Sequence, residues 1–453
     1  MKRCLSLFVA LVMLCCIPAA SMAAKMEKGV PVWTEETVQQ YLADYIEGHS
    51  VERLWGYYDL QIRRYLSQES FRSFLVDLEF LTGDFLAFGS YRSFEEPEKK
   101  LKTHVQHLCM EKLDLDVFFT HKNEKDDWEI MALEFVPADE EELPASYQEQ
   151  AKWVESVVTV GSESYPLEGT LTLPASASDA QPVPACVLVH DFEASDRDLT
   201  KGETKLFKDI AEQFAKNGIA TLRYDKRTYT YPDAPIESVS DEVIQDALSA
   251  ATLLQSNSCI DSERIVVLGI GLGGMLAPRI VTESEGMCRG VIVIGSTTDR
   301  LINVVYQREK DSVAILPEEE AKVVKNAVRN IGKMEEAVAR ELTLFGKNGY
   351  YFWDFEQYDA VKTIQKTRMP IFVAHGTKDA EVKLADGYES YREDLGKDAR
   401  FAEYRAYRRL NHLLMSDVST NAQDKPEYQD ALHLDTLAGR EMAAWILNLK
   451  PNK

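Results

Sequence analysis

The hydrophobic pattern changes from helical to strand-like periods within the first third of the chain. Apolar positions recur at helical spacing in three stretches, residues 34–45, 51–58 and 68–81. Residues 112–121 and 128–136 instead alternate apolar and polar positions, as half-buried strands do, and a polar turn separates them. Helices followed by antiparallel strands predict a small α+β domain over residues 30–138.

The pattern after residue 153 predicts a second, larger domain. Residues 153–160 and 167–173 read as a hairpin, and short apolar runs then alternate with amphipathic helical stretches. The runs lie at 185–190, 219–224, 265–268, 290–294, 370–375 and 401–407, with helices expected at 203–217, 241–256 and 433–447. This alternation is typical of a parallel sheet with crossover helices, and it predicts one α/β domain over residues 153–450.

Two segments do not follow this alternation of strands and helices. Residues 139–152 are acidic and contain a proline, and we expect them to be a linker between the domains. Residues 299–360 are mostly helical, most strongly at 318–344, and they lie between two expected strands. This position predicts a helical cap inserted into the α/β domain.

The N-terminus predicts export from the cell. Two basic residues precede the apolar run 4–20, and small residues follow it, so residues 1–24 read as a secretory signal peptide. The run is short for a spanning helix, and no later stretch is long and apolar enough to cross a bilayer. We expect a secreted or extracytoplasmic protein. Lipid attachment at Cys15 or Cys16 is less favoured, because the preceding residues are bulky.

Composition narrows the classes of partner. The 453 residues are 45% hydrophobic and carry a formal net charge of −23. An acidic surface repels phosphate backbones, so we expect no nucleic-acid partner. The oligomeric state stays open. Cysteines 109, 186, 259 and 288 remain after signal removal, no Cys-x-x-Cys or Cys/His cluster has metal spacing, and Cys186 is expected to be a core thiol.

A glycine-rich turn is the strongest local motif in the chain. The run Gly269-Ile270-Gly271-Leu272-Gly273 follows an apolar strand and precedes a helix. This is the layout of the nucleophile elbow G-x-S-x-G, in which a serine on a sharp strand-to-helix turn attacks the substrate. Gly271 stands at the serine position and has no side chain to attack with.

Two later residues match the partners that such a nucleophile requires. Acyl transfer on this layout uses a histidine to take the nucleophile's proton and an acid to orient the histidine. In chain order the acid follows the nucleophile and the histidine comes last. Asp379 follows a late strand, and His412 lies in a loop after the last expected strand. We therefore predict Asp379 and His412 as the remainder of a catalytic triad.

Together these motifs resemble secreted bacterial α/β-hydrolases related to dienelactone hydrolases and serine aminopeptidases. The similar segments are 165–174, Asp196-Arg197-Asp198, 222–227 and 273–278. The N-terminal domain resembles nuclear transport factor 2. The resemblance covers nearly all of the mature chain. It implies an α/β-hydrolase fold with a helical cap after a small α+β domain, and an activity on carboxylic esters or related acyl bonds.

The chain departs from this family in two places that should act together. Relatives have the nucleophile where Ile270 and Gly271 stand. They have a glycine-rich loop that supplies oxyanion-hole N–H groups where this chain has His190-Asp191-Phe192-Glu193-Ala194. The resemblance places Asp191, Phe192, Ile270 and Leu272 around the former oxyanion hole. We therefore expect a catalytically impaired pseudoenzyme or a ligand-binding protein, with a small acyl-type molecule as the candidate ligand.

The alternative is an active esterase or acyl hydrolase that uses His412 and Asp379 with an unusual nucleophile or an activated water. Ser195, Ser296 and Thr297 lie near strand ends, but none stands on the elbow. The aromatic run 350–353 is a candidate pocket wall. The side chains of Asp191, Glu193, Asp379 and His412 are of types that bind cations. We expect these groups to be separate and solvated, and therefore expect no metal and no other cofactor.

Overall fold

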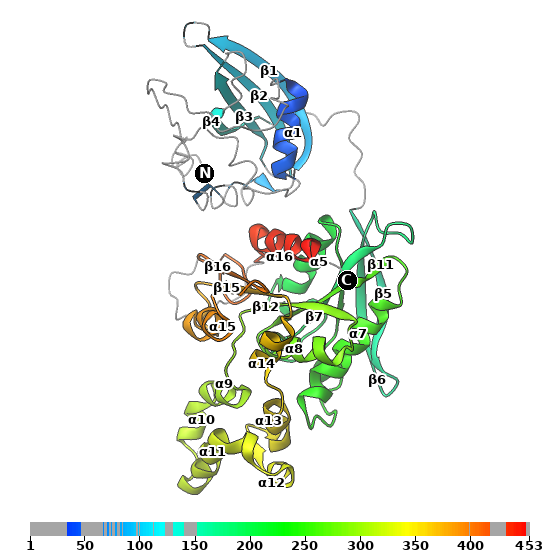
Figure 1. Cartoon of the computed structure of the whole chain (residues 1–453), viewed down its shortest axis with the longest axis vertical. Helices are drawn as coiled ribbons and strands as arrows, with labels where there is room; N and C mark the ends of the chain where they lie inside the picture. Colours follow the sequence, from blue (N-terminus) through cyan, green and yellow to red (C-terminus); the bar gives the residue numbers. More distant parts are fainter. Residues whose placement is uncertain are drawn as a thin grey trace. The chain divides into compact units, whose positions relative to one another are not determined.

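The computed structural model divides into two compact units, Met1–Gln150 and Ala151–Lys453 (Figure 1). It describes residues 34–46, single positions between 67 and 83, 85–96, 98, 100–111, 113–122, 130–139, 152–397, 399–416 and 432–449. The predicted signal peptide, the predicted helix at 51–58 and most of the predicted linker lie outside these residues. Within them, no helix combines the length and apolar character that crossing a membrane requires.

The first unit contains a four-stranded antiparallel sheet in the order β1-β2-β3-β4. Its elements are α1 (Glu35–Ile46), β1 (Phe85–Glu96), β2 (Leu101–Met110), β3 (Leu115–Lys122) and β4 (Ile130–Pro137). Val38 and Leu42 of α1 are buried in one cluster with Val117 and Phe119 of β3. The helix and the last two strands occur where the pattern predicts them. β1 and β2 were not predicted, because their charged and polar residues interrupt the alternation.

The second unit is built on an eight-stranded mixed sheet in the order β16-β15-β12-β11-β7-β10-β6-β5. Its strands are β5 (Trp153–Ser162), β6 (Tyr165–Pro174), β7 (Val183–Val189), β10 (Ala220–Tyr224), β11 (Ile260–Ile270), β12 (Cys288–Ile294), β15 (Ile371–Gly376) and β16 (Ala402–Tyr407). β5 and β6 form an antiparallel hairpin, and β6 joins β10 antiparallel. The remaining pairs are parallel. This is the α/β-hydrolase topology that the sequence predicts.

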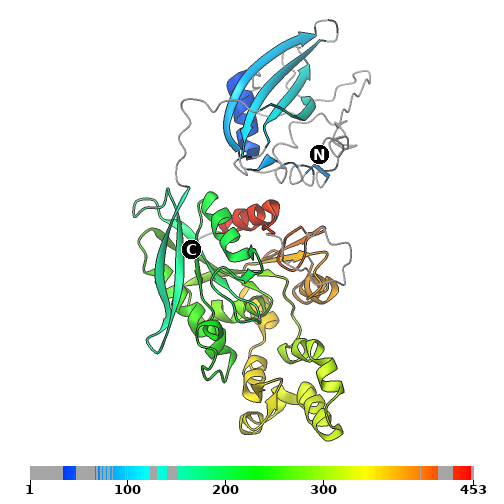
Figure 2. The same ribbon diagram turned by 180° about the vertical axis from the view of Figure 1, so that it is seen from behind.

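Helices cover both faces of this sheet (Figures 1 and 2). α5 (Leu206–Lys216) and α16 (Thr436–Asn448) share one buried cluster, and α7 (Gln245–Gln255) and α8 (Leu272–Glu283) share the other. A π-helical turn, η2 (Ser240–Ile244), leads into α7. Cys186 and Leu188 of β7 point to the first cluster, and Val187 and Val189 point to the second. Burial on both faces explains why the central strands are continuous apolar runs.

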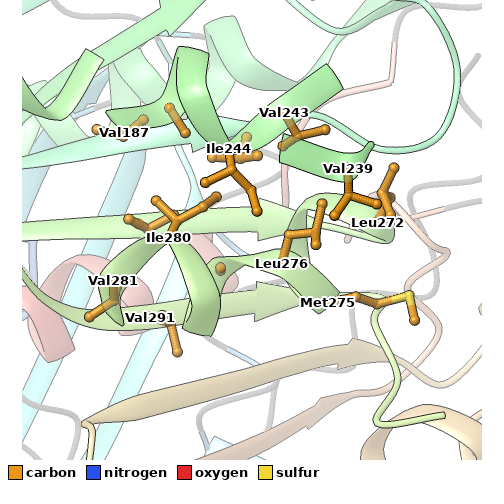
Figure 3. Close-up of a cluster of buried hydrophobic side chains, with 14 of the residues drawn as sticks. Val187, Val239, Val243, Ile244, Leu272, Met275, Leu276, Ile280, Val281 and Val291 are labelled. Atoms are coloured by element: carbon orange, nitrogen blue, oxygen red, sulfur yellow. The ribbon is translucent and has the colours of Figure 1, made fainter. Parts of the chain in front are cut away.

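Figure 3 shows how α8 is fixed on the sheet. Leu272, Leu276 and Ile280 lie on one side of the helix. They pack with Val239, just before η2, and with Val243 of η2. All five side chains are at most 4% exposed. Burying an aliphatic side chain of this size stabilises the fold by about 1.5–3 kcal/mol. The first turn of α8 is therefore held rigidly where the sequence places the elbow.

A group of short elements separates β12 from the last two strands. It contains α9 (Leu301–Arg308), α10 (Lys310–Ala314), α11 (Glu318–Asn330), η3 (Ile331–Lys333), α12 (Glu336–Arg340), the hairpin β13–β14 (Thr343–Leu344, Lys347–Asn348), α13 (Gly349–Glu356) and α14 (Ala360–Thr367). We name Leu301–Glu356 the inserted segment, and Figures 1 and 2 show it as a separate group of helices beyond the sheet. The expectation of helix through residue 344 is wrong at its end, where β13 begins. A role for this segment as a cap stays a prediction.

The smaller elements lie in loops at the ends of the parallel strands. They are β8 (Thr200–Lys201), β9 (Thr204–Lys205), α6 (Arg227–Thr230), η4 (Ala385–Glu389) and α15 (Ser390–Leu395). Several of these loops carry the residues of the candidate site.

Gly273→Ala is expected to destabilise the second unit by about 1–3 kcal/mol, the usual cost of overpacking. A Cβ at Gly273 would overlap the carbonyl oxygen of Val189 and lie 2.6 Å from that of His190. Urea unfolding of the purified chain measures the change. Gly286→Ala serves as a reference for backbone strain alone, because its φ is +94° and no atom lies within 4 Å of an added Cβ. No loss of stability in Gly273→Ala would contradict the close approach of α8 and β7.

Candidate active site

The strand-to-helix turn has the backbone of a nucleophile elbow. β11 ends at Ile270, α8 begins at Leu272, and Gly271 between them has φ +48° and ψ −111°. The Gly271 N–H donates to the carbonyl of Ile294 at 3.1 Å, and its own carbonyl accepts from the Met275 N–H at 3.0 Å. The turn is therefore fully hydrogen-bonded. Glycine adopts this positive φ without the steric cost that other residues pay.

The Asp191 carboxylate occupies the place where the side chain of a residue at position 271 would stand. A Cβ built on Gly271 would overlap Asp191 Oδ1 and lie 2.8 Å from Oδ2. Asp191 is the second residue after β7 and is 1% exposed. Its Oδ1 accepts the backbone N–H of Leu272 at 2.9 Å. That N–H, from the residue after the nucleophile, is an oxyanion-hole donor in a working elbow. Here it binds a carboxylate of the chain itself.

Asp379 and His412 come together beside this carboxylate. His412 Nδ1 lies 2.8 Å from Asp379 Oδ2, and His412 Nε2 lies 3.3 Å from Asp191 Oδ2. The other oxygen of Asp379 accepts the N–H groups of Glu381 and Val382 at 2.8 Å each. The imidazole of His412 is therefore held between two carboxylates, with Asp191 on the side where a serine would stand.

Charge determines the protonation of this trio. Burial alone would lower the pKa of His412, but the Asp379 and Asp191 carboxylates outweigh it and raise that pKa well above its usual value. Burial raises the pKa values of Asp191 and Asp379, yet the His412 charge overcomes it and leaves both below their usual range. The stable state is an imidazolium between two carboxylates. A protonated His412 cannot accept a proton from a nucleophile.

Four charged residues from the neighbouring loops and α9 form a closed ring of ion pairs. Arg308, at the end of α9 in the inserted segment, lies 3.3 Å from Glu381 and 3.6 Å from Glu193. Lys201 lies 3.7 Å from Glu381 and 3.9 Å from Glu193. The Arg308 guanidinium also lies over the ring of Phe192, 4.2 Å from its centre. The inserted segment therefore contacts two of the three loops that carry the trio, those of Asp191 and Asp379.

A buried lysine fixes the loop that carries Asp191. Lys226 Nζ donates to the carbonyl oxygens of Asp191 and Phe192 at 2.8 and 2.9 Å. It also lies 2.8 Å from Glu242, and both side chains are 2% exposed. Glu242 in turn lies 2.7 Å from Lys347 of the inserted segment. Burial raises the pKa of Glu242, but the two lysines outweigh it and lower that pKa to about 2.

The other sequence candidates take structural positions. The hydroxyls of Ser195, Ser296 and Thr297 donate to the backbone carbonyls of Glu193, Gly271 and Asp386. These contacts are not those of a nucleophile activated by His412. Cys186 is a fully buried thiol whose pKa is raised by burial, as a core thiol should be. Ile270 is also fully buried at the end of β11.

A cavity of about 260 Å³ lies one turn along α8 from Gly271. Met275, Phe355, Val361 and Ile364 give it apolar walls. Its polar lining includes Thr297, Arg300, Tyr358 and Tyr391. The aromatic run 350–353 does not line this cavity. Its Tyr350 and Trp353 rings stack on each other, and the Trp353 indole N–H donates to the Met334 carbonyl.

Sequence reasoning missed the charged residues around the trio, among them Lys226, Glu381 and Arg308. Lys226 belongs to a segment that matches the family pattern, but nothing in the pattern indicates that its ammonium group binds the backbone of the Asp191 loop. Glu381 lies two residues after Asp379, and Arg308 lies in a helix of mixed polarity. Ion pairs between segments far apart in the chain leave no periodic signal. The expectation of separate, solvated carboxylates is wrong for Asp191 and Asp379, which are 1% and 7% exposed.

Glu242→Gln is expected to lower the free energy of unfolding at pH 7 by about 3–5 kcal/mol, because it leaves Lys226 buried without its counter-charge. The folded pKa lies below the unfolded one. The wild-type stability from this carboxylate is therefore present above about pH 4.5 and is lost as the pH falls toward 2. Urea unfolding across this range measures both effects.

The matched control is Glu237→Gln, which removes an exposed pair with Arg340 and should cost less than about 1 kcal/mol. If Glu242→Gln costs no more than this control, or leaves the acid dependence unchanged, the buried pair does not fix the Asp191 loop.

Comparisons with known proteins found a similar sequence and similar solved structures. No protein-family model matches the chain. Esterase EstD of Thermotoga maritima is 28% identical over 391 residues, which cover 85% of this chain and 89% of that protein. Est1E from Butyrivibrio proteoclasticus is a similar solved structure, with 14% identity, a TM-score of 0.41, and coverage of 65% of this chain and 99% of Est1E. The dienelactone hydrolase of Anabaena variabilis has 13% identity, a TM-score of 0.39, and coverage of 66% and 98%. The sheet order and the EstD relative together identify the chain as a protein of the α/β-hydrolase fold.

Proposed function

We propose that this chain is an exported pseudoenzyme of the esterase type, which keeps the α/β-hydrolase fold but has lost serine-dependent acyl transfer. One observation carries the proposal. The Asp191 carboxylate fills the space of the nucleophile's side chain at Gly271 and binds the Leu272 N–H. The similarity to an esterase supports the ester-hydrolysing ancestry. The basic and apolar N-terminus supports export.

Three losses combine at the elbow. Position 271 offers no nucleophile, the Leu272 N–H is bound to an anion, and the His412 imidazolium has no free site for a proton. Loss of one oxyanion-hole donor costs about 100- to 1000-fold in rate. Loss of the nucleophile itself costs on the order of a millionfold. Serine-type hydrolysis by this site is therefore negligible.

The cavity beside the elbow supports a ligand-binding role. Its apolar wall of Met275, Phe355, Val361 and Ile364 suits a hydrocarbon chain, and its hydroxyl groups suit a carbonyl or carboxyl oxygen. The inserted segment supplies Phe355, as expected of a cap over a ligand. A small molecule of the acyl type is the proposed ligand.

One observation favours a second function. Asp191 Oδ2 lies 3.3 Å from His412 Nε2, the position that a nucleophile oxygen takes beside its base. A carboxylate nucleophile, or a water held by this pair, would make the chain an active hydrolase. In that case both Asp191→Asn and His412→Ala would abolish a measurable wild-type rate.

The proposed function predicts a specific pattern of rescue with p-nitrophenyl acetate and butyrate. The purified mature chain should show no rate above a denatured control. Gly271→Ser alone should also stay inactive, because the new Cβ would overlap Asp191 Oδ1. The double variant Asp191→Gly/Gly271→Ser vacates that space and frees the Leu272 N–H, so a measurable rate should appear.

His412→Ala in the double variant is the control, and it should abolish the restored rate. This result would show that Asp379 and His412 are still aligned for catalysis. A clear wild-type rate that His412→Ala removes would overturn the pseudoenzyme proposal and favour the second function.

A further inference from the structure

Three potential metal ligands converge where the serine would stand. One ligand atom each from Asp191, Glu381 and His412 lies within 4.8 Å of the other two. Asp191 and His412 are 1% and 2% exposed, and the Glu381 side chain is 18% exposed. Two of the three groups are therefore shielded from water, unlike ordinary surface carboxylates.

Groups outside this set orient two of the ligands. Asp379 binds His412 Nδ1 at 2.8 Å, and the Leu272 N–H binds Asp191 Oδ1 at 2.9 Å. These contacts leave His412 Nε2 and Asp191 Oδ2 directed toward each other, 3.3 Å apart. A carboxylate on the far nitrogen of a histidine is the usual support of a histidine that binds a metal ion, since it fixes the tautomer and raises the basicity of the ligand nitrogen.

The charges around the site leave a surplus of negative charge. Four carboxylates, those of Asp191, Glu193, Asp379 and Glu381, are linked through ion pairs to two side-chain cations, Arg308 and Lys201. With the His412 imidazolium the difference is one negative charge, and it becomes two when a metal ion displaces the proton of His412 Nε2. One divalent cation would neutralise it, and burial makes uncompensated charge costly.

We propose that Asp191, Glu381 and His412 bind one divalent transition-metal ion, of the class of Zn²⁺ or Mn²⁺. The nitrogen ligand favours such ions over Mg²⁺ and Ca²⁺, which prefer oxygen ligands alone. Three protein ligands leave at least one position open for water or a ligand oxygen. The site goes beyond the pseudoenzyme proposal, because it assigns a binding role to the residues that displaced the serine chemistry.

Arg308 and Lys201 oppose the binding of a cation at this site. Both form ion pairs with Glu381, and the Arg308 guanidinium also lies over the Phe192 ring. Their positive charges repel an ion that comes close to Glu381. Arg308→Ala should therefore speed metal uptake, whereas the three ligands stay in place.

Calorimetric titration of the full mature chain, treated with a chelator and then titrated with ZnCl₂ or MnCl₂, tests the proposal. Wild type should bind one more equivalent than Asp191→Asn or Glu381→Gln. Asp379→Asn should keep the site but bind about 10- to 100-fold more weakly, as an outer-shell change does. The matched control is Glu193→Gln, which removes a carboxylate that pairs with the same two cations but supplies no ligand. It should bind the same number of equivalents as wild type, with a smaller loss of affinity than Asp379→Asn.

Two further measures keep the result decisive. His107, Cys109 and Asp114 of the first unit also lie close enough to one another to share an ion. The test therefore compares the number of bound ions between wild type and variants. An ion bound in the first unit contributes equally to both and does not change the difference. The thermal unfolding midpoint should rise with Zn²⁺ in wild type and Glu193→Gln, and this rise should be smaller in Asp191→Asn. If Asp191→Asn does not fold, the comparison of wild type with Glu381→Gln decides the test, because Glu381 is partly exposed.

The proposal would be overturned if wild type, Asp191→Asn and Glu381→Gln bound the same number of ions with the same affinity. It would also be overturned if wild type bound no ion at millimolar concentration. No ester is present in these titrations, so metal binding and ester hydrolysis are measured independently. Hydrolysis by the wild type would contradict the pseudoenzyme proposal, and absence of ion binding would contradict the metal site.

Discussion

The site depends on a steric exclusion between two positions that are 80 residues apart in the chain. The carboxylate of Asp191 and any side chain at position 271 compete for the same volume, because Asp191 Oδ1 lies where a Cβ on Gly271 would be. The two departures from the family pattern are therefore one change. A side chain at position 271 would displace Asp191, and a glycine at position 191 would leave His412 and the Leu272 N–H facing empty space.

The surrounding structure holds this arrangement in place. Lys226 binds the carbonyls of the Asp191 loop, Glu242 compensates its charge, and Lys347 links Glu242 to the inserted segment. Arg308 also joins the inserted segment to Glu381 and Glu193. The inserted segment is thus tied to the site through one buried and one partly exposed set of ion pairs. A movement of that segment would change the contacts of both loops.

The sequence predicted the sheet and the elbow because both have strong local signals. Buried strands are apolar runs, and the turn at Gly271 needs glycines at fixed spacing. Asp379 and His412 were found from chain order. The occupation of the nucleophile's place by Asp191 could not be predicted, since it depends on a side-chain direction fixed by Leu272 and His412 from distant segments. The strands β1 and β2 were missed for a related reason, because the pairing of β1 with β2 and of β2 with β3 outweighs an irregular pattern.

A crystal structure of the metal-free mature chain tests the central claim most directly, through the distance between the Asp191 carboxylate and the backbone nitrogen of Leu272. The account predicts a hydrogen bond of about 2.9 Å, with the carboxylate against Gly271 and His412 between Asp191 and Asp379. An Asp191 carboxylate turned away from Gly271, with no hydrogen bond to the Leu272 N–H, would contradict this account.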